Sequence, residues 1–381
     1  MRLLHLADLH LGWVPRFLGD KEGERQRERD SLLARAVDYA LDPAHGIGLV
    51  LIAGDLFESH TPPKDLAAQV LQELRRLEAA GVKVVTVPGN HDEITYPNSV
   101  YREMAGDWPG VLVQNPRPQL VAVVPVGGED CYLYSLAYTG GLTPTAQPLA
   151  DFPRLEAPGW HLGVFHGSLD WSAGDRSLPL SSEGLGRARY HYVALGHLHR
   201  HRVVALPSGP AVYAGAVEPK GFDDPGVGFF TVVTLAPEGA TIEKVAAGAR
   251  RVRVERVDAG LFATPAELES RLESFADGEA LTRIVLTGTA NFPLSADRLA
   301  ERLASRFYYL EVEDETTTLN PDLLVAWARE PTIRGLFVRR LQERMARAET
   351  ARERQVIARA LLNGLASLRA GGEGETRPEA F

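Results

Sequence analysis

Short apolar runs alternate with helical patterns over about the first 245 residues of the chain. Five of these runs, LLHLA, LVLIAG, VVTVPG, LGVF and YVALG, have the length of buried strands. Two segments between the first three runs are amphipathic at helical spacing, and the second of them ends at Gly81. Their apolar faces are formed by Leu32, Leu33, Ala36, Val37 and Ala40, and by Leu66, Val70, Leu74 and Leu77. The strand, helix, strand order predicts parallel pairing in an α/β domain.

The pattern predicts further units along the rest of the chain. Residues 111–245 are rich in Gly and Pro and mostly strand-like, and they complete a first domain over 1–245. Residues 246–318 follow a β-α-β-α-β order, typical of a small α+β domain, whose first strand has the alternating charges of an exposed edge. Residues 319–370 are predicted to be helical, and the final segment, 371–381, to be disordered.

Each of the five apolar runs ends in a short polar cluster. Strand ends in layered α/β folds are where functional sites are built, so we expect the five clusters to meet at one site. The clusters are Asp8 with His10, Asp55, Asn90 with His91 and Asp92, His166, and His197 with His199.

These side chains suit a pair of divalent cations. Two cations about 3.5 to 4 Å apart can bridge the oxygens of a phosphodiester, lower the pKa of a bound water and stabilise the leaving oxygen. Carboxylates, imidazoles and an amide oxygen, without thiolates, favour manganese, iron, zinc or magnesium. Residues two apart on an extended segment point the same way, as we expect for Asp8 with His10 and for His197 with His199. We expect Asp55, which follows a glycine, to bridge the two cations.

The five motifs are weak one by one and strong together. Gly-Asp alone marks many turns, GNHD could be a tight turn, and GHLH could be a surface loop. In order, however, DxH, GD, GNHD, H and GHxH resemble the calcineurin-like metallophosphoesterase superfamily. The resemblance implies a β-sandwich flanked by helices. It implies a first metal held by Asp8, His10, Asp55 and His199, and a second held by Asp55, Asn90, His166 and His197.

The same resemblance implies that His91 donates a proton to the leaving oxygen or stabilises charge in the transition state, with Asp92 holding its ring. Within the superfamily, LLHLADLHLG, AGDLFE followed by PP, and PGNHD resemble the DNA-repair exonuclease branch, which includes SbcD, the Mre-eleven nuclease and YhaO-like proteins. Glu58 departs from the branch, because members often carry histidine or aspartate three residues after the bridging aspartate. Histidine there is associated with the archaeal and eukaryotic nucleases, so an SbcD-like or a YhaO-like subgroup is favoured, and the choice between them stays open.

That branch resemblance implies a manganese-dependent nuclease in DNA repair, with 3′ to 5′ exonuclease action on duplex ends and endonuclease action on single strands. It also implies a small capping domain, helices that dock on an SMC-like ATPase of the SbcC or YhaN type, and a homodimer. Two rival functions remain. One is a phosphoesterase of small molecules, such as cyclic nucleotides, or of phosphoproteins. The other is a mainly structural subunit that regulates the ATPase.

Composition changes this interpretation little. A chain of 381 residues, 45% hydrophobic and 24% charged, is typical of an enzyme with a large core. The net charge of -9 argues against DNA binding by bulk positive charge, but not against DNA as a substrate. The single cysteine, Cys131, is expected to be a small buried apolar residue. The chain shows neither a signal peptide nor a membrane-spanning run, so we expect a cytoplasmic protein without membrane contact.

The helical segment after residue 320 has a charge of its own. Residues 321–370 carry ten arginines against five acidic residues, a balance of +5. Its apolar side chains could dock on a partner or pack on each other, and the arginines could contact DNA. The apolar positions are Leu336, Phe337, Leu341, Met345, Val356, Ile357, Leu361, Leu362, Leu365 and Leu368.

Overall fold

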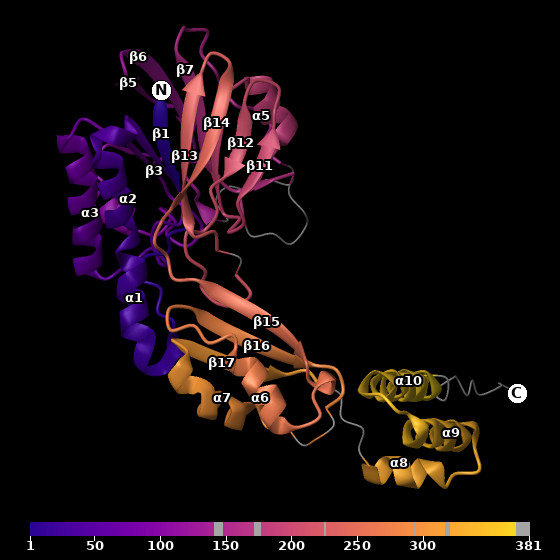
Figure 1. Cartoon of the computed structure of the whole chain (residues 1–381). Coiled ribbons are helices and arrows are strands. Elements are labelled where there is room, and N and C mark those ends of the chain that lie inside the picture. Colours follow the sequence, from indigo (N-terminus) through magenta and orange to yellow (C-terminus); the bar gives the residue numbers. More distant parts are fainter. Residues whose placement is uncertain are drawn as a thin grey trace, which may run out of the picture. The chain divides into compact units, whose positions relative to one another are not determined.

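The computed structural model of the chain divides into two compact units, Met1–Arg250 and Arg251–Phe381 (Figure 1). The structure describes residues 1–140, 148–170, 177–224, 226–290, 292, 294–316 and 321–370. The predicted disordered tail, 371–381, lies outside the described residues.

The first unit contains two six-stranded sheets. The first sheet has the order β14-β13-β1-β2-β3-β4, in which β1 to β4 are parallel and β13 pairs antiparallel with both β1 and β14. The parallel pairing predicted from the strand, helix, strand order is therefore confirmed. The strands are β1 (Arg2–Leu6), β2 (Leu49–Ala53), β3 (Lys83–Val87), β4 (Val111–Leu112), β13 (Phe229–Ala236) and β14 (Gly239–Ala246).

The second sheet has the order β11-β12-β10-β7-β6-β5, with β12, β10, β7 and β6 parallel. The edge strands β11 and β5 pair antiparallel with their neighbours. The strands are β5 (Gln119–Val126), β6 (Glu129–Ser135), β7 (Trp160–His166), β10 (Tyr192–Gly196), β11 (Arg202–Ala205) and β12 (Pro210–Tyr213), and β8 (Ser168–Leu169) and β9 (Pro179–Leu180) form a separate pair.

One apolar core joins the two sheets and the helices of the first. It contains inward side chains of both sheets, such as Ile52 and Val164, together with the faces of α2 and α3, which lie side by side in Figure 1. The buried residues of α2 are the five predicted from the sequence, and those of α3 include all four. The helices of this unit are η1 (Arg16–Lys21), α1 (Glu22–Asp30), α2 (Leu32–Leu41), η2 (Pro43–His45), α3 (Lys64–Ala79), α4 (Val100–Glu103) and α5 (Ser182–Ala188).

The parallel strands end at the same edge of each sheet, which brings the polar clusters together. Strands β1, β2 and β3 of one sheet and β7 and β10 of the other each run directly into one of the five clusters. The predicted β-sandwich flanked by helices is confirmed. Cys131 is fully buried in its core, as predicted.

The second unit combines a parallel three-stranded sheet with helices. The sheet has the order β15-β16-β17, so β15 is an edge strand, as predicted. One apolar cluster lies between this sheet and α6 and α7, and another joins α8, α9 and α10. The elements are β15 (Val252–Asp258), η4 (Ala259–Leu261), α6 (Pro265–Glu273), β16 (Leu281–Thr287), α7 (Ala296–Leu303), η5 (Ala304–Arg306), β17 (Tyr309–Asp314), α8 (Pro321–Ala328), α9 (Ile333–Arg347) and α10 (Ala351–Ala370).

The apolar residues of the last two helices divide between packing and exposure. Leu341, Leu361 and Leu365 are buried against one another, whereas Leu336 is 51% exposed and Val356 is 62% exposed. The buried side chains can therefore serve internal packing, and the exposed ones are available to a partner. Among the described residues, none of the helices has the length and apolar character needed to cross a membrane.

Candidate metal centre

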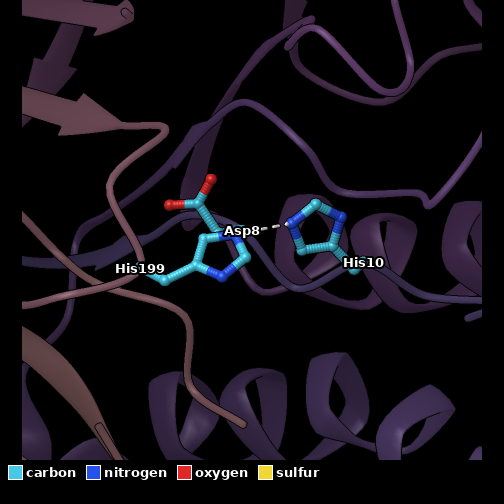
Figure 2. Close-up of side chains that lie close together, drawn as sticks. All are labelled: Asp8, His10 and His199. Carbon is cyan, nitrogen blue, oxygen red and sulfur yellow. Dashed lines mark hydrogen bonds between the residues drawn. The ribbon is translucent and has the colours of Figure 1, made fainter. Parts of the chain in front are cut away.

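The first cluster of candidate ligands joins the loop after β1 to the loop after β10. The Nε2 atoms of His10 and His199 are 3.1 Å apart, and Asp8 completes a group that could hold one cation. Figure 2 shows the two imidazole rings turned toward each other beside the Asp8 carboxylate. The backbone N–H of His197 lies 3.0 and 3.1 Å from the two Asp8 oxygens and fixes the direction of this carboxylate.

The second cluster surrounds the Asn90 side chain. Its Oδ1 lies 2.9 Å from His166 Nε2 and 2.9 Å from His197 Nδ1. His166 Nδ1 is 2.9 Å from the carbonyl oxygen of Ala53, to which it must donate. In the neutral ring this bond leaves the lone pair on Nε2, directed at the cluster, as a metal ligand requires.

Asp55 lies between the two clusters. Its Oδ2 is 3.8 Å from His10 Nε2 and 3.4 Å from His166 Nε2, while its Oδ1 accepts a 2.9 Å hydrogen bond from the backbone of His91. Burial raises the pKa of this carboxyl, but the neighbouring His166 and His10 lower it below its usual range. Asp55 is thus an ionised carboxylate placed where it could contact two cations.

Two glycines make this arrangement sterically feasible: Gly54 precedes Asp55 in the chain, and Gly89 lies against the Asp55 carboxylate. Gly54 has a φ of +89°, and a Cβ there would collide with the His166 ring. A Cβ on Gly89 would collide with the Asp55 carboxylate. The glycine before Asp55 thus makes room for a histidine side chain, and not only for an approaching cation.

The candidate ligands do not lie on extended backbone, contrary to the expectation from their spacing. Asp8 has a φ of 53°, His10 of 49°, Asp55 of 49° and His197 of 100°. The strands end before these residues, and the loops turn through the left-handed region that non-glycine residues seldom adopt. Such strain persists only where surrounding contacts hold it, and it gathers at functional sites.

The protonation of the cluster fits a cation site. Burial raises the pKa of Asp8 to about 6. Burial lowers the pKa of His166, but the charges of Asp55 and Asp8 raise it to about 9. Protons therefore compensate the buried carboxylates of this site, and divalent cations would replace them on binding. The donor set of carboxylate and amide oxygens and imidazole nitrogens suits hard and borderline metals.

Two carboxylates contact the Nδ1 atoms of His10 and His199, which we call the first histidine pair. Glu58 Oε2 lies 2.9 Å from His10 Nδ1, and Asp224 Oδ2 lies 2.9 Å from His199 Nδ1. Lys220 joins the two carboxylates, because its Nζ is 2.5 Å from Glu58 and its backbone N–H is 2.9 Å from Asp224. Carboxylates in this position orient a ligating imidazole and increase its basicity. In the sequence Glu58 stood out only as a departure from the family pattern, and no signal pointed to Asp224 or Lys220.

Asp92 has a different contact set from the one expected. Its carboxylate accepts hydrogen bonds from the backbone of Gly89 and Phe57 and from the hydroxyl of Tyr101. The His91 ring instead places Nδ1 3.3 Å from the carbonyl oxygen of Glu58. These contacts thus join Asp92 to its own loop and to Tyr101, and the His91 ring to Glu58; a catalytic role for His91 and Asp92 stays a prediction.

Buried arginines tie two of the ligand loops together. Arg29 is 1% exposed and donates to the carbonyl oxygens of Leu9, at 3.2 Å, and Pro219, at 2.8 Å. Arg25, 2% exposed, forms an ion pair with Glu218, which is 1% exposed. The loop that carries His10 and the segment that leads to Asp224 are therefore fixed to the same helix, α1.

We expect Glu58→Gln to weaken cation binding about 10- to 100-fold, because an amide gives His10 Nδ1 a less negative partner. Isothermal titration with Mn²⁺ measures this change, and Glu183→Gln, at an exposed glutamate of α5, is the matched control. An unchanged affinity in Glu58→Gln would show that the contact with His10 has no role in cation binding.

The sequence signature of calcineurin-like phosphoesterases matches residues 1–201, which include all five clusters. The chain belongs to this family. Three curated relatives of this phosphoesterase are the uncharacterized metallophosphoesterase YhaO of Bacillus subtilis, the DNA double-strand break repair protein Mre11 of Aeropyrum pernix and the SbcD component of the nuclease SbcCD of Escherichia coli.

YhaO is 25% identical over 59% of this chain and 55% of its own length. Mre11 is 27% identical over 68% of this chain and 64% of its own length, and SbcD is 23% identical over 59% and 62%. The phosphoesterase thus spans less than two thirds of each relative. The relatives agree with the DNA-repair exonuclease branch that the sequence resembles.

Proposed function

We propose that this phosphoesterase is a two-metal DNA nuclease that acts in DNA repair. The observation that carries the proposal is the position of Asp55 between two ligand clusters, one around His10 and His199 and one around Asn90. The names of the Mre11 and SbcCD relatives support DNA as the substrate. We propose manganese as the metal, with His10, His199 and Asp8 at one position, and Asn90, His166 and His197 at the other.

In this proposal the chain's own residues position the reaction. When bound, the two cations supply positive charge to the phosphodiester and lower the pKa of water. The His91 ring packs against the His10 ring with 4.7 Å between centroids, and its Nδ1 donates to Glu58. In its protonated form the ring also carries a hydrogen on Nε2, and we propose that this proton passes to the leaving 3′ oxygen.

The second unit supports proposals about how DNA is positioned and which partner the chain binds. We propose that residues 246–318 form a capping domain that positions DNA and that 319–370 dock on an SMC-like ATPase. The exposed side chains of Leu336 and Val356, in a segment with a charge of +5, give such a partner an apolar and basic surface. We propose 3′ to 5′ polarity on duplex ends and endonuclease action on single strands.

Degradation of end-labelled DNA tests this function. With Mn²⁺ we expect the chain to shorten duplex DNA from its 3′ ends and to cut single strands, and we expect chelation by EDTA to abolish both activities. Asp55→Asn should lose at least about 10²-fold in turnover, since it removes the charge of a carboxylate that lies near both clusters. Asp151→Asn, an exposed aspartate, is the matched control.

A small phosphodiester, bis-p-nitrophenyl phosphate, separates the rival functions. Hydrolysis of this ester without degradation of DNA would overturn the nuclease and favour a phosphoesterase of small molecules or phosphoproteins. Absence of both activities would favour a structural subunit.

A further inference from the structure

A row of three aromatic rings lies on two segments, one directly after His10 and one that also carries Lys220 and Asp224. The ring centroids of Trp13 and Phe17 are 6.4 Å apart, and those of Phe17 and Phe222 are 6.3 Å apart. Phe17, in the middle of the row, is 42% exposed, although it is a large apolar side chain. An exposed aromatic ring beside a catalytic site is a candidate contact for substrate.

The row is connected to the metal centre through the backbone. The backbone N–H of Trp13 donates to the carbonyl oxygen of His10 at 3.2 Å, so Trp13 lies one turn of the chain beyond a candidate ligand. Phe222 stands between Lys220, which contacts Glu58, and Asp224, which contacts His199. Trp13 is therefore bonded to the His10 backbone, and Phe222 lies two residues from Asp224, which contacts His199.

The buried side chain of Arg29 contacts the Trp13 ring and the backbone of both segments. The Arg29 guanidinium lies 4.8 Å from the centre of the Trp13 ring and donates to Leu9 on one loop and to Glu218 and Pro219 on the other. The two loops thus cannot move independently without breaking these bonds. A Trp13 ring held in this way loses little entropy when a ligand stacks on it.

We propose that Trp13, Phe17 and Phe222 form a base-stacking subsite for the DNA strand whose phosphate lies at the metal centre. The proposal rests on the proposed nuclease function and adds how that site holds its substrate. Nucleobases stack on aromatic side chains with little regard to sequence, as an end-degrading nuclease requires. Arg16, at the start of the short helix that carries Phe17, adds positive charge for the backbone, and the nearby Asp20, Glu22 and Asp223 offset it, so the proposal depends on stacking.

The test compares two single-stranded oligonucleotides with the same backbone, one with natural bases and one with tetrahydrofuran spacers in place of the bases. With the full chain and Mn²⁺, we expect kcat/KM to be higher for the natural strand. Phe17→Ala should reduce the preference for the natural strand about 5- to 100-fold, mainly through KM. Phe17→Trp should retain it, and Phe222→Ala provides a second variant in the same row.

Val123→Ala is the matched control, because Val123 is 44% exposed on the edge strand β5 of the second sheet. It should keep the preference of the unmodified chain. Equal cleavage of both strands by the unmodified chain, or an unaltered preference in both alanine variants of the row, would overturn the stacking subsite while leaving the nuclease intact. Failure to cut either strand would overturn the subsite together with the proposed action on single strands, and the duplex assay then decides whether the exonuclease function stands.

Discussion

Replacing His91 with alanine is expected to lower the turnover of DNA about 10²- to 10⁴-fold while the chain still binds cations. The ring is 38% exposed, packs against His10 and donates from Nδ1 to Glu58, so it can reach a leaving oxygen without being enclosed by the ligands. The measurement is kcat at saturating DNA with Mn²⁺, together with the metal content of the protein after gel filtration.

The metal content decides between two roles for this ring. His91 also forms a possible ligand group with His10 and Asp55. Loss of bound metal in step with loss of turnover would make His91 a ligand and remove the proposed proton transfer. His45→Ala is the matched control and should leave both quantities unchanged, because this histidine, the last residue of η2, stacks on Tyr39 and is not a candidate ligand.

Replacing Glu218 with glutamine is expected to lower the free energy of unfolding by roughly 3 to 5 kcal/mol. Glu218, Arg25 and Arg29 are each at most 2% exposed, so the substitution leaves two guanidinium groups in the interior without their shared carboxylate. Water cannot replace the lost charge, because the site is closed to solvent. Urea denaturation, with the midpoint and slope both fitted, measures the change.

The control for this prediction is a second Arg–Glu pair on the surface. Glu183 and Arg187 are 2.6 Å apart on α5, with side chains 83% and 55% exposed. Glu183→Gln should cost less than about 1 kcal/mol. Similar losses in the two variants would mean that the buried pair contributes no more than an ordinary surface pair.

Apolar periodicity predicted the parts of the fold that depend on local pattern. The buried faces of α2 and α3 follow from apolar residues three and four apart, and the parallel order of β1, β2 and β3 follows from the intervening helices. The five clusters were found for the same reason, because polar residues directly after apolar runs mark strand ends.

The sequence could not reveal what depends on tertiary contacts. GERQRERD has the composition of an exposed charged helix, yet Arg25 and Arg29 are buried because Glu218, 193 residues after Arg25, lies against them. Asp224 lies in a Gly- and Pro-rich segment without periodicity, and only the folded chain brings it to His199. The left-handed turns at Asp8 and His10 have no sequence signal either, because no glycine stands there.

The position of β1 has a consequence for synthesis of the protein. This strand leads into Asp8, and its two neighbours are β2, from residues 49–53, and β13, from residues 229–236. The candidate ligands, by contrast, end at His199. A nascent chain that ends between residues 199 and 229 carries every candidate ligand. It lacks β13, the strand that pairs with β1 on the side away from β2. Since chains emerge from the ribosome N-terminus first, β1 and the Asp8 loop that follows it should become fully fixed only after β13 has emerged and joined the sheet.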